Sequence, residues 1–178
     1  MATPRHIAWK PRLRGEYSYA TGNAHRNAQR ASTFDQLYPS NHNAFGLTDL
    51  FGFQNIREAR VNLYLNPLKN LTVLVQQEWL SMATKQDDVY AGSASVLAKP
   101  PTAGFSRSGL GREIDASGAY VFHDYLVVNA GVGHFSPDGA MVQSGHGAPL
   151  TIAYLSFNYR FKLDRKLATP QQRRKRPR

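Results

Sequence analysis

The sequence predicts an all-β chain that contributes about six strands to an antiparallel, up-and-down transmembrane β-barrel. Segments of roughly ten residues alternate between apolar and polar side chains, which is typical of strands with two different faces. Short and long connections between these segments alternate along the chain. Aromatic residues gather near the ends of the apolar faces. Together these features favour a partial barrel that has lipid on one side and water on the other.

The first three predicted strands lie in the N-terminal half. Each places apolar or aromatic residues at one parity and mainly charged, hydroxyl or amide residues at the other, although Leu74 and Gln77 interrupt the third. The predicted strands are Ile7–Ala20, Ile56–Asn66 and Leu71–Ser81. Their apolar positions are Trp9, Leu13, Tyr17 and Tyr19, then Ala59, Val61, Leu63 and Leu65, then Leu71, Val73, Val75 and Trp79.

The last three predicted strands follow the same rule. They are Arg112–Phe122, Tyr125–Gly133 and Leu150–Phe161. Because the final segment ends on an aromatic residue, it is predicted to be the closing strand. The apolar positions are Ile114, Ala116, Gly118, Tyr120 and Phe122, then Leu126, Val128, Ala130 and Val132, then Ala153, Leu155, Phe157, Tyr159 and Phe161.

The connections differ strongly in length. Asn66–Asn70 and His123–Asp124 are short turns, whereas about Thr21–Asn55, Met82–Gly111 and Ser136–Pro149 are long. Transmembrane barrels have short turns at one end and long loops at the other. Loops of this size are uncommon in compact soluble domains.

Aromatic residues near the strand ends also favour a membrane setting, because barrels carry aromatic girdles at both interfaces. The β propensity of aromatic residues would explain their presence but not these positions. The residues are Trp9, Tyr17, Tyr19, Trp79, Tyr120, Phe122, Tyr159 and Phe161.

The net charge of +10 is concentrated in a C-terminal tail. Residues 162–178 hold eight Lys or Arg and one Asp. Because the last eight residues have no apolar side chain except Pro, we expect a disordered basic tail over 162–178, after a barrel segment over 1–161.

Several motifs resemble the alginate-export family of outer-membrane proteins. Gly111, Glu113 and Asp115 precede a Gly-rich run over residues 131–139, and the final strand ends at Phe161. The most specific likeness is a loop motif formed by Phe34, Asp35, Leu37, Tyr38, Pro39, His42, Gly46, Asp49, Gln54 and Asn55. The likeness covers about residues 7–161, and this stretch resembles the C-terminal portion of the family pattern.

The resemblance implies a large outer-membrane barrel whose electropositive lumen passes an anionic polysaccharide such as alginate. Outer-membrane lipid, the polysaccharide and the barrel-assembly machinery would be its partners. Cationic residues of the predicted polar faces could attract uronate carboxylates and relay them, or they could simply balance Glu16, Glu58, Glu78, Glu113 and Asp115. These candidate lumen residues are Lys10, Arg12, Arg14, Arg60, Arg112 and Arg160.

Two features depart from a complete outer-membrane protein. Six strands are fewer than the eight of the smallest usual barrels, so we expect a partial barrel. Residues 1–20 also lack the continuous apolar core of a secretory signal.

No catalytic, cofactor or metal site is predicted. The chain has no cysteine and no nucleophile elbow, and its glycine pairs do not form a phosphate loop. His134 and His146 flank a Gly-rich loop with Asp138, which is only a weak metal signal.

Two other functions stay open. A soluble, lipocalin-like ligand-binding module would show the same alternation if the apolar faces formed a core. Nucleic-acid binding through Arg173–Arg178 ranks third and is not expected, because no RNA-recognition signature accompanies the tail.

Overall fold

The computed structural model describes residues 9–25, 32–39 and 45–161, and of Asp124 it describes the backbone only. Six long strands form one antiparallel sheet in the order β1-β2-β3-β6-β7-β8, so each strand pairs with its neighbour in this series. The strands are β1 (Arg12–Ala20), β2 (Ile56–Leu68), β3 (Leu71–Met82), β6 (Gly109–Phe122), β7 (Leu126–Pro137) and β8 (Leu150–Tyr159).

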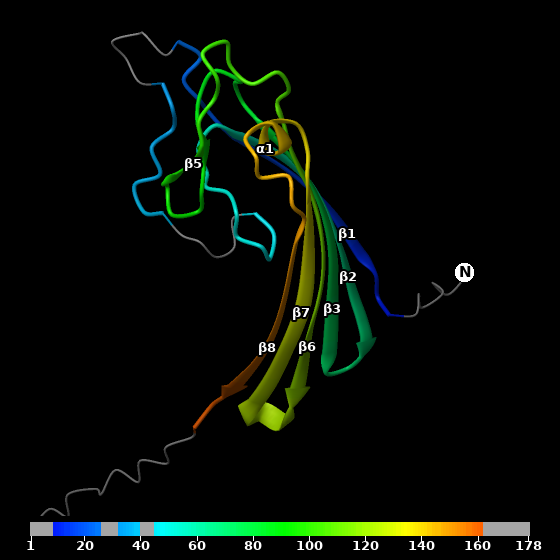
Figure 1. Cartoon of the computed structure of the whole chain (residues 1–178). Helices are drawn as coiled ribbons and strands as arrows, with labels where there is room; N and C mark the ends of the chain where they lie inside the picture. Colours follow the sequence, from blue (N-terminus) through cyan, green and yellow to red (C-terminus); the bar gives the residue numbers. More distant parts are fainter. Residues whose placement is uncertain (1–8, 26–31, 40–44, 162–178) are drawn as a thin grey trace, which may run out of the picture.

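Small elements occupy the connections. A two-stranded hairpin, β4 (Val89–Tyr90) and β5 (Val96–Ala98), and a short helix, α1 (Gly139–Gln143), lie in the long segments. A 3-10 turn, η1 (His123–Tyr125), joins β6 to β7. The long segments gather at one end of a curved sheet and the short turns at the other (Figure 1).

The structure confirms an all-β, antiparallel arrangement and the six predicted long strands, with shifted ends. β1 begins at Arg12 because Trp9 and Lys10 have positive φ angles of 68° and 45°, which interrupt an extended strand. β6 and β7 extend further toward the long segments than their alternation predicted. The predicted disordered tail, residues 162–178, lies outside the described residues.

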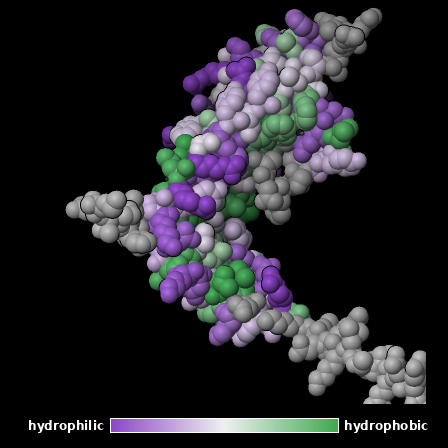
Figure 2. All heavy atoms as spheres, turned by 180° about the vertical axis from the view of Figure 1, so that it is seen from behind, coloured by the Kyte–Doolittle hydropathy of each residue, from purple (hydrophilic) through white to green (hydrophobic). Residues whose placement is uncertain are grey.

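The register shows two chemically different faces. One row of the apolar face crosses all six strands and consists of Leu13, Leu63, Val75, Ala116, Val132 and Ala153. One row of the polar face consists of Glu16, Arg60, Glu78, Glu113, Phe135 and Leu150. Figure 2 shows hydrophobic patches interspersed with hydrophilic ones on the face that it draws.

The buried apolar core does not lie on the apolar face. It forms on the polar face, at the end of the sheet where the long segments pack. It includes Phe45, Phe51, Leu80, Phe105 and Phe135. Phe51 meets Phe135 edge to face at 5.4 Å between ring centroids. By contrast Leu13, Leu155 and Phe157 are 75%, 62% and 66% exposed. Among the described residues, none of the helices has the length and hydropathy to cross a membrane.

Candidate functional site: a loop seated on buried carboxylates

Four carboxylates lie together on the polar face, close to the long segments. Glu58, Glu78, Glu113 and Asp115, the carboxylate cluster, are between 0% and 4% exposed. Glu78 and Glu113 are opposite each other in the β3–β6 register, and Asp115 follows one row further along. Because alternate residues of a strand share a face, the three strands bring these side chains to one place.

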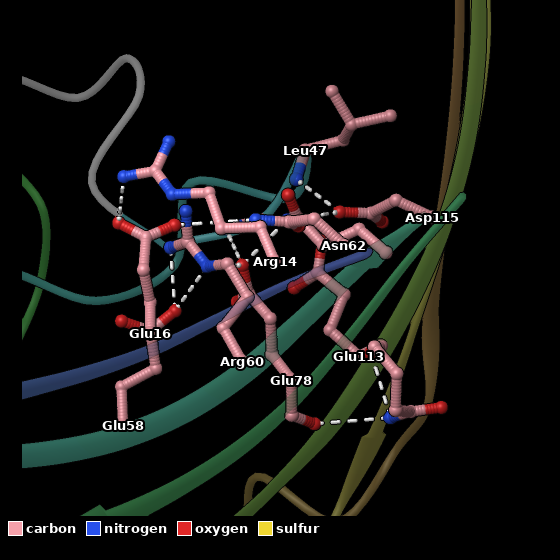
Figure 3. A network of polar contacts seen from close by, with 12 residues as sticks. Arg14, Glu16, Leu47, Glu58, Arg60, Asn62, Glu78, Glu113 and Asp115 are labelled. Atoms are coloured by element: carbon pink, nitrogen blue, oxygen red, sulfur yellow. Dashed lines mark hydrogen bonds and ion pairs between the residues drawn. The ribbon is translucent and has the colours of Figure 1, made fainter. Parts of the chain in front are cut away.

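The cluster holds a segment of the first long connection against the sheet. The Gly46 amide donates to Glu78 Oε1 at 3.0 Å, and the Leu47 amide donates to Asp115 Oδ2 at 3.1 Å. Thr48 donates to Glu113 through its amide at 2.8 Å and through its hydroxyl at 2.5 Å. Figure 3 shows the Leu47 amide and Asp115 directed toward one another. We call residues 45–50 the seated loop.

Glycine is required at Gly46. Its φ angle is +65°, and a Cβ atom there would lie 2.3 Å from the carboxyl carbon of Glu113. Such a φ angle strains residues that carry a Cβ. The close approach therefore explains why this position of the loop motif is Gly.

Arg60 links two members of the cluster. Its guanidinium lies 2.5 Å from Glu58 Oε1 and 2.8 Å from Glu78 Oε1, with only 13% of its side chain exposed. The Gln76 amide adds donors to Glu78 and Asp115 at 2.5 and 3.3 Å. Buried carboxylates need such partners, because an unpaired buried charge is strongly destabilising.

The side of the polar face nearer the short turns is more open and carries other cations. Arg14 is exposed and pairs with Glu16 at 2.9 Å, and Arg12 lies over the Tyr64 ring at 5.3 Å. Arg160 follows β8, and its amide donates to Tyr125 O. The balancing role considered for the arginines therefore describes Arg14 and Arg60 in this structure.

Three of the six predicted lumen residues, Lys10, Arg112 and Arg160, do not lie on the polar face of a strand. Arg112 pairs in register with Trp79 and shares the apolar face, so its assignment to the polar face was wrong. The reason is parity, since Arg112 is two residues from Ile114. Lys10 precedes β1 with a φ angle of 45°, so strand alternation assigns it to neither face.

The family-like loop motif has both buried and exposed members. Asn55 is 1% exposed, and its side-chain amide donates to the carbonyls of Thr84 and Asp88. Its Oδ1 accepts from the Thr84 amide at 2.8 Å. Leu37 and Tyr38 are 78% and 90% exposed, and His42 lies outside the described residues. Asn55 therefore ties the first long connection to the second.

A second polar centre joins the same two connections. Asp87 accepts hydrogen bonds from the Asn23 amide, the Thr33 hydroxyl, the Asp88 amide and the Tyr90 hydroxyl at 2.6–3.1 Å. Burial and the Asp87 carboxylate raise the pKa of Tyr90 to about 12. These contacts connect the first long segment to the second.

The sequence did not predict the carboxylate cluster as an anchor for a loop. Its members were recognised as polar-face residues, but only as partners of arginines. The shared register of Glu78 and Glu113 was a usable signal once the strands were paired. No sequence pattern indicated that the Gly46-Leu47-Thr48 amides would meet them. The described residues contain no group of three or more His, Cys, Asp or Glu that could hold a metal ion.

The sequence matches a known protein family over most of its length. A family model described as alginate export matches residues 3–153, which is most of the chain. No curated protein matches the sequence. The match includes all of the loop motif and five of the six long strands. The chain belongs to the alginate export family.

Proposed function

We propose that this chain forms part of the wall of an outer-membrane channel through which an anionic polysaccharide such as alginate passes. The observation that carries the proposal is that acidic side chains on one face of the sheet are buried while apolar side chains on the other face are exposed. Glu78 and Glu113 are 0% and 1% exposed, whereas Leu155 and Phe157 on the opposite face are 62% and 66% exposed. In a lipid-spanning sheet the apolar face meets hydrocarbon and the polar face meets the lumen.

The apolar face has suitable dimensions for this role. Tyr17, Tyr19 and Trp79 lie toward the long segments, and Tyr120 and Phe122 lie toward the short turns. Trp79 and Leu71, the register partner of Tyr120, are eight residues apart on β3. This corresponds to about 27 Å along a strand, or about 20 Å along the membrane normal at a typical tilt, close to the apolar band of known barrels.

The seated loop has a specific place in the proposed channel. It packs on the polar face, so it would lie inside the lumen and narrow it at the end with the long segments. The cations nearer the short turns, Arg12, Arg14 and Arg160, are exposed and would meet the solute. Guanidinium groups pair with carboxylates and stay charged at any relevant pH, so they can relay a polyuronate.

The partners follow from the two faces. Outer-membrane lipid would cover the apolar face, the polysaccharide would contact the polar face, and the barrel-assembly machinery would insert the strands. The soluble lipocalin-like alternative needs a core on the apolar face, but the described core lies on the other side. The nucleic-acid alternative depends on Arg173–Arg178, which lie outside the described residues.

The test is to express the chain natively and to fractionate membranes. We expect it in the outer-membrane fraction, extracted only by detergent, with gel mobility that changes on heating. In proteoliposomes, uptake of an oligouronate should exceed uptake of a neutral oligosaccharide of equal length. Arg12→Gln with Arg14→Gln should lower the uptake of the oligouronate and leave that of the neutral oligosaccharide unchanged. Recovery of the whole chain as a soluble monomer without detergent would contradict the proposal.

A further inference from the structure

A basic pocket lies at the outward side of the sheet, where the apolar face ends and the long segments begin. It has a volume of about 720 Å³. Three cationic side chains and one carboxylate line it: Arg57, Lys85, Arg107 and Asp138. Thr84 and Ser108 add hydroxyl groups, and so does Ser106, whose hydroxyl donates to Gln143 Oε1 at 2.8 Å. The lining therefore combines a positive charge excess with hydroxyl donors.

The register assigns Arg57 to the apolar face. It is opposite Tyr19 on β1 and Ser81 on β3, both of which follow the parity of Trp79. The Arg57 guanidinium donates to the Ala83 carbonyl at 2.7 Å and lies 5.9 Å from the centroid of the Tyr19 ring. It is thus held beside an aromatic residue of the girdle, on the side away from the carboxylate cluster.

The contacts of the other two cations leave the pocket positive. Lys85 donates to the Ser106 carbonyl at 3.3 Å, which orients the ammonium without cancelling its charge. Arg107 lies 3.4 Å from Asp138, and both side chains are largely exposed, so solvent weakens this ion pair. Arg112, one row nearer the membrane centre on the same face, adds a further positive charge beside Trp79.

We propose that this pocket binds the phosphate group of a lipid headgroup in the leaflet that surrounds the long-segment end of the sheet. The inference rests on the proposed membrane-spanning role of the apolar face. Aromatic girdles lie at the level of the headgroups, so cations just beyond Tyr19 and Trp79 would lie among lipid phosphates. The polysaccharide carboxylates would meet the opposite face, which makes lipid the better match for this pocket.

Brominated lipids provide a direct test, because bromine quenches nearby tryptophan fluorescence. The chain has two tryptophans, so Trp9→Phe leaves Trp79 as a single reporter beside the pocket. The full chain would be placed in phosphatidylcholine vesicles containing either brominated phosphatidic acid or extra brominated phosphatidylcholine. We expect phosphatidic acid to quench Trp79 more strongly, and free inorganic phosphate not to reduce the difference.

The variants locate the effect. Replacing Arg57, Lys85 and Arg107 together by Gln should lower the local enrichment of phosphatidic acid at least about fivefold, since each cation near a membrane surface contributes to anionic-lipid binding. Lys85→Arg with Arg107→Lys should retain the enrichment because the charge is kept. Arg12→Gln with Arg14→Gln removes two cations from the opposite, polar face and should leave the enrichment unchanged, which makes it the control for position. Strand content by circular dichroism checks that each variant folds.

The outcomes separate the two proposals. Equal quenching by both lipids, or enrichment that survives the triple substitution, would overturn the phosphate site while leaving the membrane role intact. Loss of the enrichment on adding free phosphate would show a site for a soluble anion and would also overturn the lipid assignment. If neither brominated lipid quenches Trp79, the apolar face does not meet lipid, and both proposals fail.

Discussion

The two faces of the six-stranded sheet share one backbone and one hydrogen-bond register, but their side chains are buried by different means. On the polar face, carboxylates are covered by a loop of the same chain and paired with amides and a guanidinium. On the apolar face, Leu13, Leu155 and Phe157 are exposed and are not covered by the described segments. The difference teaches that the chain buries carboxylates of its polar face by itself, whereas many apolar side chains of the other face stay exposed, as the proposed membrane role requires.

Removing the charge partner of the buried carboxylates on the polar face should lower the stability most. Arg60→Gln removes the cation between Glu58 and Glu78, so both buried carboxylates lose their ion pair with Arg60. We expect the free energy of unfolding to fall by about 3–5 kcal/mol, as when one partner of a buried ion pair is lost. Denaturant unfolding followed by circular dichroism, in detergent or vesicles, measures it.

Two further variants give that measurement its control. Arg14→Gln breaks an exposed pair with Glu16 and should cost at most about 1 kcal/mol. Arg60→Gln combined with Glu78→Gln should recover part of the loss, because one uncompensated charge is removed. If Arg14→Gln proved as costly as Arg60→Gln, burial would not be what distinguishes the two pairs.

A charge on the apolar face tests whether lipid covers it. Val75 lies midway between Leu71 and Trp79 on β3, at the centre of the proposed membrane band. Val75→Lys should lower the stability in vesicles by about 2–4 kcal/mol, the cost of Lys at the midplane of a barrel. Leu74→Lys, on the opposite face of the same strand, should cost less. A Val75→Lys chain as stable as the parent in vesicles would contradict lipid contact.

Removing Glu113 tests whether this carboxylate holds the seated loop against the polar face. Glu113→Ala removes the acceptor of both Thr48 hydrogen bonds, so the Thr48 amide and hydroxyl lose their partner. We expect about 1–3 kcal/mol of destabilisation. The diagnostic result is faster proteolysis within residues 45–50 while the strand content stays unchanged. Glu16→Gln, at the edge of the same row, is the control. Unchanged proteolysis in Glu113→Ala would show that other contacts hold the loop.

The smallest effect concerns the contacts among the long segments. The pKa of Tyr90 is raised from 10 to about 12, so the folded state favours the neutral phenol. This stabilisation is complete below pH 10 and is lost as the pH rises from 10 toward 12. Hydrogen exchange of the Asn23 and Asp88 amides should accelerate more between these pH values in the parent than in Tyr90→Phe. Equal acceleration in both chains would assign the effect to another group.

Alternation alone was sufficient to predict the long strands and their two faces. A strand's side chains repeat every two residues, so Glu78, Glu113 and Asp115 could be assigned to one face without any tertiary contact. The same rule, applied consistently, would have assigned Arg112 to the apolar face. Lys10 lies before β1, so its place in the lumen stays a prediction; the positive φ angles of Trp9 and Lys10 left no signature in the alternation.

The sequence by itself determined the order of the strands, the short and long connections, and the separation of polar from apolar faces, because these depend on local periodicity and turn chemistry. The tertiary structure alone decided what lies on the polar face. Hydrogen bonds between Thr48 and Glu113 join residues 65 positions apart, and the Leu47 amide meets Asp115 across 68. Such contacts depend on how a long connection folds back, and amide groups are present at every residue except proline. Only the folded chain selects which of them reach the carboxylates.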